Sequence, residues 1–366
     1  LMKKNILVVI GTRPNFIKVT QFKSVVKNYP LLNLKIAHTG QHFDEKMADV
    51  FFNQFNLTPD YFFNIMQSSP NSQIAEIMVK LEQLINSQFK PDILVVVGDV
   101  NSTLAAALTA NKMGIKLAHL ESGLRSDDLT MPEEHNRILT DKLTNLFFVT
   151  EQSGYDNLKS EHINDDQILF SGNTMIDTLV AFSPQIEQSN ILELLSLKTN
   201  EFVLMTMHRP ATVDNKHGLL KLNELITYLS QKYKIVFPIH PRTLKKAEEF
   251  GLKELFVNNK NLLLTDPLDY FAFQKLIISS KFILTDSGGI QEESTFVGKP
   301  CLTLRPNTER PVTVTEGTNT LVPFDLEAIK HYIFQIEDGT YKKGKVPKFW
   351  DGKSTQRILE FISNLN

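Results

Sequence analysis

The sequence predicts an α/β protein built from two doubly wound halves in tandem. Two observations lead to this prediction. Short apolar runs alternate with stretches of helical spacing, which is the pattern of parallel sheets joined by right-handed helical crossovers. The chain also has 366 residues, which is more than one hydrophobic core usually organises, so two domains are expected.

The first half opens with the apolar run Asn5–Ile10, which has the length and composition of a buried strand. Gly11-Thr12-Arg13-Pro14 breaks this run, and the next segment has helical spacing. The alternation continues with strands over Leu34–Ala37, Ile93–Val97 and Leu117–Leu120 and helices over Phe16–Asn28, Glu45–Gln54, Gln73–Asn86 and Ser102–Met113. This half is therefore expected to form one parallel sheet with helices on its faces.

The alternation weakens between Phe182 and Asn200, where Ser, Pro, Gln and Asn accumulate. We therefore expect an N-terminal domain over residues 1–182 and a second domain over residues 183–352. The second domain repeats the pattern, with strands over Phe202–Met207, Ile235–Ile239, Leu262–Leu264, Phe282–Thr285 and Cys301–Leu304 and helices over His217–Gln231 and Phe271–Ser279. The C-terminal segment 353–366 is helical by its spacing, and we expect it to pack back on the first domain.

Charge and cysteine content argue against several classes of function. A net charge of −2 gives no electrostatic reason to expect binding to nucleic acid or to a membrane surface. The single cysteine, Cys301, rules out an intrachain disulfide and fits a reducing cytoplasm, where we expect the protein. The first apolar run is too short for the core of a signal peptide, and no apolar stretch reaches membrane-spanning length.

The segment Thr285–Glu293 suggests a phosphate site. Here an apolar strand turns through Ser287-Gly288-Gly289 into a helix, whose first N–H groups and dipole favour an anion. Ser287 adds a hydroxyl, and the two glycines let a phosphate approach closely. Glu293, in the first turn, is placed to accept hydrogen bonds from ribose hydroxyls. An ordinary capped helix after a strand has the same local pattern, so the rest of the chain must decide between the two.

Charged residues follow several of the predicted strands, at the edge where open parallel sheets bind ligands. Arg13, Lys18 and Arg310 are candidates to neutralise a diphosphate, although each alone is also typical of a solvated surface cation. Two such edges that face each other would form an interdomain cleft for a polar ligand.

Carboxylates at loop positions point to general acid–base chemistry. Asp99 and Glu121 each end a strand, and Glu133 lies in the first turn of a helix after Pro132. Helix-capping acids would explain Glu133 equally well. His208 directly follows a strand, which suits proton transfer or phosphate binding. The sequence has neither a dinucleotide fingerprint nor a Walker A motif, and we expect neither a metal nor a nicotinamide cofactor.

A series of short motifs then occurs together and in order along the chain. They are Gly11-Thr12-Arg13-Pro14, His38-Thr39-Gly40-Gln41-His42, Gly98-Asp99, His119-Leu120-Glu121-Ser122-Gly123-Leu124-Arg125, Pro132-Glu133-Glu134, Gly172-Asn173-Thr174, His208-Arg209, Asp286–Glu293 and Glu309-Arg310-Pro311. From Ile6 to about Val322 the chain thereby closely resembles the non-hydrolysing UDP-N-acetylglucosamine 2-epimerase family.

The resemblance implies a glycosyltransferase-B type fold with two Rossmann-like domains, a homodimer, and interconversion of UDP-N-acetylglucosamine and UDP-N-acetylmannosamine without a cofactor. The residues that match family positions for uridine diphosphate are Arg13, Lys18, Phe273 (near the uracil), Ser287, Gly288, Gly289, Glu293 and Arg310. Those that match catalytic positions are Asp99, Glu121, Glu133 and His208. Those near a regulatory UDP-sugar site of some members are Gln41, His42, Arg209 and His240.

Three positions depart from the family pattern. Asn15 stands where Glu is common, Val100 where Thr is common, and Pro210 where a second Arg follows His-Arg. Four alternatives remain open: a glycosyltransferase of the same architecture, a hydrolysing 2-epimerase that releases free N-acetylmannosamine, an epimerase of another UDP-2-acetamido sugar, and a non-catalytic UDP-sugar-binding regulator.

Overall fold

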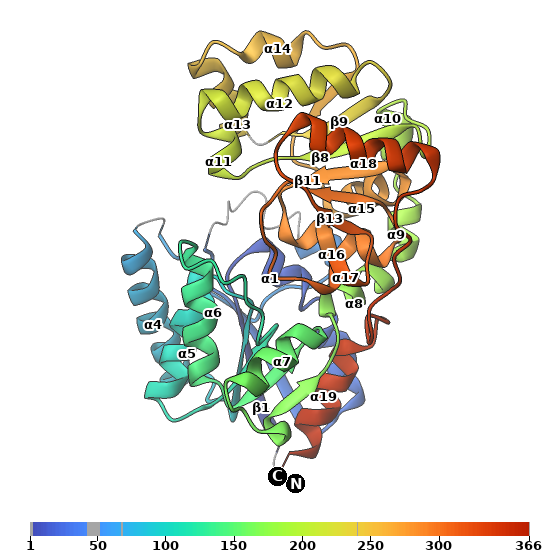
Figure 1. Ribbon diagram of the computed structural model, residues 1–366. Coiled ribbons are helices and arrows are strands. Elements are labelled where there is room, and N and C mark those ends of the chain that lie inside the picture. Colours follow the sequence, from blue (N-terminus) through green and yellow to red (C-terminus); the bar gives the residue numbers. More distant parts are fainter. Residues whose placement is uncertain (1–2, 42–51, 67–68, 240, 366) are drawn as a thin grey trace. The chain divides into compact units, whose positions relative to one another are not determined.

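The computed structural model describes residues 3–41, 52–66, 69–239 and 241–365 of the chain (Figure 1). It divides into two compact units. The first comprises Leu1–Ala181 together with Lys348–Asn366, and the second comprises Phe182–Pro347. The chain therefore returns to the first unit before residue 352, where the sequence pattern had suggested that the second domain ends.

The first unit contains a seven-stranded sheet in the order β3-β2-β1-β4-β5-β6-β7. Every pairing in it is parallel. Its strands are β1 (Lys4–Ile10), β2 (Leu32–His38), β3 (Tyr61–Phe62), β4 (Ile93–Val97), β5 (Lys116–Leu120), β6 (Leu146–Val149) and β7 (Ile168–Phe170). β4 is buried along its whole length, as expected for a strand covered on both faces.

Helices and short 3₁₀ turns connect these strands. They are α1 (Arg13–Ile17), α2 (Phe22–Val25), η1 (Val26–Asn28), α4 (Pro70–Ser87), α5 (Asn101–Lys112), α6 (Pro132–Leu143), α7 (Gln152–Ser160), η2 (Asp165–Gln167) and α8 (Thr174–Ala181). The single helix expected over Phe16–Asn28 is wrong, because turns separate α1 from α2. In this break the side chain of Lys18 is buried and Thr20 hydrogen-bonds Thr178 at 2.6 Å, so tertiary contacts override helical spacing. The helix expected over Glu45–Gln54 lies largely outside the described residues.

The C-terminal helix α19 (Ser354–Asn364) packs on α2 and α8 of the first unit. Its first N–H groups, those of Ser354 and Thr355, donate to the buried carboxylate of Asp177 at 3.0 and 2.6 Å. Just before it, the indole of Trp350 is buried and donates to the carbonyl of Thr150 at 2.9 Å. The returning segment is thus part of the core of the first unit.

The second unit contains a six-stranded parallel sheet in the order β10-β9-β8-β11-β12-β13. Its strands are β8 (Phe202–Thr206), β9 (Lys234–Pro238), β10 (Leu262–Thr265), β11 (Phe282–Thr285), β12 (Cys301–Thr303) and β13 (Asn319–Leu321). Its helices are α9 (Ser183–Glu187), α10 (Ile191–Leu194), α11 (Pro210–Val213), α12 (Lys216–Leu229), α13 (Pro241–Glu249), α14 (Lys253–Val257), α15 (Tyr270–Ser279), α16 (Gly288–Phe296), α17 (Val312–Thr315) and α18 (Leu326–Asp338).

Both sheets share one topology. In each, the strand order reverses beside the first strand, between β1 and β4 in one sheet and between β8 and β11 in the other. Such switch points are where doubly wound sheets open to ligands. The residues that follow these strands are therefore the first place to look for a site in either unit.

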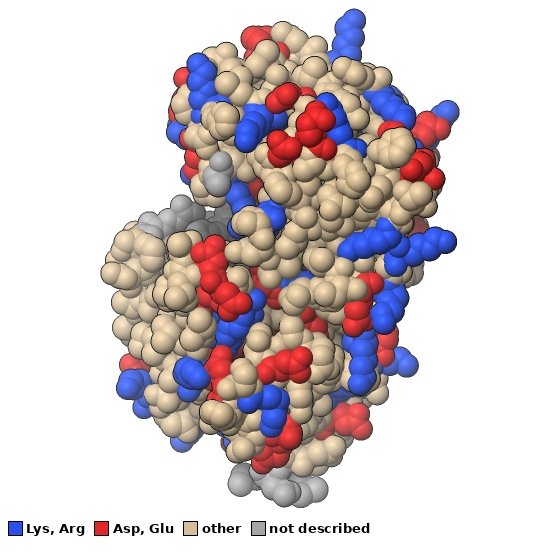
Figure 2. Space-filling model, in the orientation of Figure 1, with Lys and Arg blue, Asp and Glu red and all other residues tan. Residues whose placement is uncertain are grey.

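On the face drawn in Figure 2, basic and acidic side chains are interspersed, in keeping with the net charge of −2. Within residues 3–41, 52–66, 69–239 and 241–365, no helix is both long enough and apolar enough to cross a membrane.

Candidate active site

Glu121 lies directly after β5, at the carboxyl edge of the first sheet, and its carboxylate is buried. Its Oε2 lies 2.6 Å from the ammonium of Lys18, which is buried as well. Glu121 has a φ of +70°, an uncommon conformation for a residue with a side chain, and such strain is often found at functional sites. Lys18 therefore has a carboxylate partner within the first unit. From the sequence alone, Lys18 was expected only to bind phosphate.

Gly98 lies beside this pair, in a backbone conformation that favours glycine. It lies between β4 and Asp99 with a φ of +66°, and a Cβ atom there would lie 3.6 Å from Glu121 Oε2 and 3.8 Å from Lys18 Nζ. The amide of Asn15 fixes the same corner: it accepts from the N–H of Gly11 and donates to the carbonyl of Val97, both at 3.2 Å. A glutamate at position 15 has no donor for the second bond, so asparagine suits this site.

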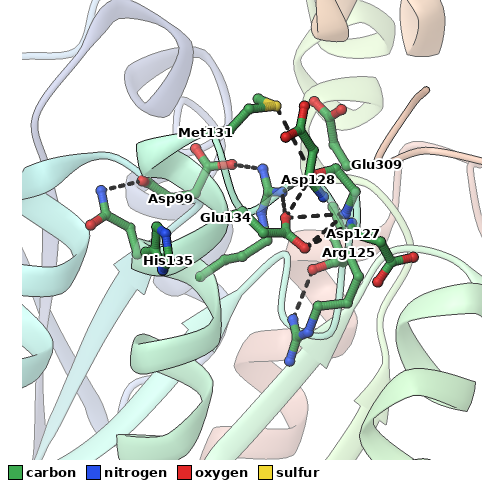
Figure 3. Close-up of polar contacts among 12 residues, drawn as sticks. Asp99, Arg125, Asp127, Asp128, Met131, Glu134, His135 and Glu309 are labelled. Atoms are coloured by element: carbon green, nitrogen blue, oxygen red, sulfur yellow. Dashed lines mark hydrogen bonds and ion pairs between the residues drawn. The ribbon is translucent and has the colours of Figure 1, made fainter. Parts of the chain in front are cut away.

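Asp99 belongs to a second charged group, at the start of α6 (Figure 3). The guanidinium of Arg137 bridges the carboxylates of Asp99 and Glu134. Glu134 also accepts hydrogen bonds from the backbone N–H groups of Ser126 and Asp127, each at 3.0 Å. Burial alone would raise the pKa of Glu134, but these hydrogen bonds and the Arg137 charge outweigh burial and lower it.

The structure separates the two neighbouring glutamates of α6. Glu134 is buried and held by Arg137, whereas Glu133 is exposed. Neighbouring residues on a helix point about 100° apart, so only one of the two can face this charged group. Of the two, Glu133 is therefore accessible to a ligand. Glu134 instead fixes the loop that contains Ser126 and Asp127.

A buried network ties together the loops that carry Asp99 and Glu121. His119 places Nε2 2.8 Å from the carbonyl of Gly98 and Nδ1 2.7 Å from Asp141. The other oxygen of Asp141 accepts from the N–H of Gly123 at 3.0 Å and from Arg125 at 2.7 Å. Burial would raise the pKa of Asp141, but the adjacent His119 and Arg125 hold it below its ordinary value. Asp141 was not among the sequence candidates, because nothing local marks it.

Gln41 caps a helix across the fold. Its side-chain oxygen accepts from the N–H of Ser102 at 3.0 Å and from the Ser102 hydroxyl at 2.7 Å. Val100, the N-cap residue of α5, has no side chain able to cap it. Gln41 thus supplies the cap that a threonine at position 100 would supply locally. Arg13, in the first position of α1, is half-buried.

In the second unit, His208 follows β8 and stands beside Asp286, which follows the neighbouring strand β11. Its Nδ1 lies 2.8 Å from Asp286 Oδ1, and its ring is mostly exposed. The other oxygen of Asp286 accepts the backbone N–H groups of His208 and Arg209 at 2.9 and 2.8 Å. Burial would raise the pKa of Asp286, but His208 and these N–H donors lower it. Asp286 therefore fixes both the loop and the ring of His208.

The first turn of α16 is open to an anion. Ser287 is the N-cap residue, yet its hydroxyl makes no capping hydrogen bond. Ser287, Gly288 and Gly289 are all partly exposed. A Cβ atom on Gly288 would lie 3.0 Å from both Arg310 Nη1 and Glu309 Oε1, so a charged loop lies directly against the helix start. Unmet N–H groups, the helix dipole and a nearby guanidinium together form a phosphate site.

Arg310 lies in a buried cluster of charged residues. Its Nε is 2.8 Å from Glu292 and its Nη1 is 2.5 Å from Glu309. Glu309 also accepts from Arg305 at 3.0 Å. Sequence reasoning missed Arg305, although it stands directly after the β12 segment, as the other candidates follow their strands.

Glu293 and Phe273 lie on the two helices that flank β11. Glu293 lies in the second turn of α16, not in the first as the sequence suggested, because the helix already begins at Gly288. It is buried and accepts from the amide of Gln274 at 2.5 Å. Phe273, on α15, is partly buried against the core. The neighbouring Tyr270 has its pKa raised by burial and then by Glu293. His42 and His240, two residues expected near a regulatory site, lie outside the described residues.

A sequence profile described as UDP-N-acetylglucosamine 2-epimerase matches residues 24–363. The chain belongs to this family. Among full-length relatives, the UDP-N-acetylglucosamine 2-epimerase of Methanococcus maripaludis is 39% identical over 97% of both chains. The UDP-2,3-diacetamido-2,3-dideoxy-D-glucuronate 2-epimerase of Pseudomonas aeruginosa is 34% identical over 98% of this chain and 99% of the relative.

Solved structures of this epimerase family match the fold. The UDP-GlcNAc 2-epimerase of Methanocaldococcus jannaschii, in complex with UDP-GlcNAc and UDP, is 37% identical, with a TM-score of 0.88 over 98% of this chain and 99% of that one. A distant likeness extends to the glycosyltransferase UGT2 of Phytolacca americana, at 12% identity and a TM-score of 0.59 over 98% and 94% of the two chains. The two parallel sheets thus form a glycosyltransferase-B type fold, as the sequence predicted.

Proposed function

We propose that the chain interconverts UDP-N-acetylglucosamine and UDP-N-acetylmannosamine by eliminating UDP and adding it back with inversion at C2. Epimerase activity on UDP-N-acetylglucosamine, an isomerase reaction, follows from membership of the family. The observation that supports the elimination route is the contrast between the two sheet edges. One edge carries carboxylates and the other carries an anion site.

The reaction at C2 needs both a carboxylate to move a proton and an anion site to hold the leaving diphosphate. The C2 proton is not acidic, because no carbonyl lies next to it in the ring. When the C1–O bond to UDP breaks, C1 gains oxocarbenium character and a carboxylate can remove the C2 proton. The electron pair of the C2–H bond forms the C1–C2 double bond, which leaves a glycal and UDP. Protonation of C2 on the opposite face and re-addition of UDP at C1 give the epimer.

In this scheme the second unit stabilises the leaving diphosphate. Its donors are the start of α16, with Ser287, Gly288 and Gly289, and the guanidinium of Arg310. Glu293 accepts from the ribose, Phe273 contacts the uracil, and Arg13 with Lys18 adds positive charge near the phosphates. Lys18 then has a double role, since it also neutralises the buried carboxylate of Glu121.

Asp99, Glu121 and Glu133 of the first unit, with His208 of the second, carry the proton transfers. Glu121 and Asp99 each contact a cation, and they are our candidates to accept a proton. Glu133 is exposed and is the candidate to supply one. We assign these roles to the four residues as a group.

One experiment in D₂O tests this function. UDP-N-acetylglucosamine incubated with the protein should equilibrate with its C2 epimer, and the C2 proton signal should disappear from the proton NMR spectrum as solvent deuterium enters. Free N-acetylmannosamine and UDP as the only products would instead identify a hydrolysing enzyme. Binding without exchange at C2 would identify a regulator or, with an acceptor, a transferase. Exchange that occurs only with UDP-2,3-diacetamido sugars would show that the enzyme catalyses the same reaction on a different substrate.

We also infer a homodimer in the cytoplasm. Val79 of α4 and Leu139 of α6 are about half exposed, and these helices lie on either side of α5. Exposed apolar residues on neighbouring helices favour an interface with a second copy. The thiol of Cys301, the one cysteine, is buried and unpaired, which fits a reducing compartment. Sedimentation velocity of the native protein and of Leu139→Glu tests the dimer, which the substitution should weaken.

A further inference from the structure

The most unusual charge in the second unit is Arg305. It follows β12 at the carboxyl edge of the sheet, and only 2% of its surface is exposed. One of its terminal nitrogens, Nη2, donates to Glu309 at 3.0 Å. Within the described residues, Nε and Nη1 are buried and have no hydrogen-bond partner. A guanidinium has five N–H donors, and burying several of them unmet is costly, so this side chain is held ready for an acceptor.

Arg305 reaches the start of α16 through two bonded neighbours. Glu309 binds Arg305 with one oxygen and Arg310, at 2.5 Å, with the other. Glu309 Oε1 and Arg310 Nη1 each lie 3.0 Å from the point that a Cβ atom would occupy if Gly288 had a side chain. A nine-residue helix with an uncapped start and a buried arginine with unmet donors therefore meet in one place.

Charged groups of both signs gather around this point. Burial is the main reason that the pKa of Arg305 lies below its ordinary value, and the nearby charges of Arg209 and Arg310 lower it further, against the pull of Glu309. Glu292 and Glu309 balance two of the three guanidinium groups. A group of arginines that repel one another is stabilised when a multivalent anion enters.

We propose that Arg305 is a diphosphate-binding residue, which donates through Nε and Nη1 to the phosphoryl group that lies beyond the helix start. This inference rests on the proposed function, because it takes the diphosphate of a UDP-sugar as the anion. One phosphoryl group takes the N–H groups of Gly288 and Gly289, and the other takes Arg305 and Arg310. Arg305 thereby selects for two phosphoryl groups over one and stabilises the leaving UDP.

The test compares UDP with UMP as calorimetric ligands of the full chain. In Arg305→Lys and Arg305→Gln, the affinity for UDP should fall at least tenfold while the affinity for UMP changes less than threefold. Arg357→Lys and Arg357→Gln are matched controls, since Arg357 pairs with Asp351 in the first unit, and they should bind both ligands like the native protein. The lysine variant keeps a positive charge beside Glu309. It should therefore remain folded and give a result even if the glutamine variant does not fold.

Three results would overturn the proposal, and they are distinguishable. If the native chain binds UDP and the lysine variant binds it equally well, Arg305 has no role in diphosphate binding and the proposed function stands. The same holds if UDP and UMP lose affinity equally, because the effect would then not depend on the second phosphoryl group. If the native chain neither binds UDP nor exchanges the C2 proton, the proposed function fails and this inference fails with it.

Discussion

The two sheet edges of this protein have the same topology and opposite chemistry. In the first unit, the residues after β4 and β5 are the carboxylates of Asp99 and Glu121. Asp99 pairs with Arg137 of α6, and Glu121 pairs with Lys18 of the turn after α1. In the second, the residues after β11 and β12 lead to an uncapped helix and to the guanidinium groups of Arg305 and Arg310, which pair with Glu309 and Glu292.

The strand order is the same in both sheets, so the residues at the strand ends account for the difference between the two edges. The first edge holds carboxylates beside cations, which suits proton transfer. The second has unmet N–H donors, which suits the binding of a charged leaving group. The predictions below test this division of labour.

The largest effect should come from neutralising the acids of the first unit. Asp99→Asn, Glu121→Gln and Glu133→Gln should each lower turnover by roughly a hundredfold or more, the usual scale of general acid–base catalysis. UDP affinity should stay close to native, because these groups act chiefly in the transition state. Steady-state epimerisation and UDP titration measure the two quantities. Near-native turnover in all three variants would show that the carboxylates are structural.

The next largest effect should come from removing phosphate donors of the second unit. Ser287→Ala and Arg310→Ala should each weaken UDP binding by roughly 10- to 100-fold, since a hydrogen bond to a charged group typically contributes about 1.5–3 kcal/mol. Calorimetry with UDP is the measurement. Lys330→Ala, at a partly exposed position of α18, is the control. Unchanged affinity in both variants would mean that the diphosphate binds elsewhere.

A smaller effect should follow when His208 loses its carboxylate neighbour. Asp286→Asn keeps the size of the side chain but removes the charge beside Nδ1, so turnover should fall about tenfold through misplacement of the ring. The pH–rate profile should change shape, which a purely structural loss would not cause. Because the pKa of Asp286 is lowered on folding, its contribution to stability is present above about pH 4 and is lost as the pH falls below it. The free energy of unfolding of Asp286→Asn should lack this pH-dependent contribution.

The smallest effect concerns Gln41, which the structure makes a helix cap and which the family resemblance places near a regulatory site. Gln41→Ala should lower the free energy of unfolding by about 1 kcal/mol, the usual value of an N-cap. Urea denaturation measures it. Val100→Thr in the same background should restore part of the stability through a local cap. If the double variant regains stability but still responds differently to added UDP-sugar, Gln41 also has a regulatory role.

Much of the fold follows from the sequence because β1, β4, β8 and β11 are buried apolar runs whose flanking turns are clear. Leu146–Val149 has the same signal. The edge strands Ile168–Phe170 and Asn319–Leu321 have three residues each, too few for any periodicity to show.

The candidate site is predictable only as far as strand ends reveal it. Asp99, Glu121, His208 and Ser287 stand out because each follows an apolar run. Pairings between distant residues have no local signature: Lys18 and Glu121 lie 103 positions apart, and His119 and Asp141 lie 22 apart. Which of Glu133 and Glu134 is buried depends on how α6 packs, which the sequence alone does not fix.

The cap on α5 has a consequence for how the protein folds. The acceptor for its first turn comes from Gln41, 61 residues earlier in the chain, and not from the residue in front of the helix. An isolated peptide over Asn101–Lys112 would lack this acceptor, so its first turn should fray. Helix initiation here must await the docking of β2 beside β1, which couples the order of the Asp99 loop to completion of the sheet. Such long-range closure slows folding and makes the unit assemble cooperatively.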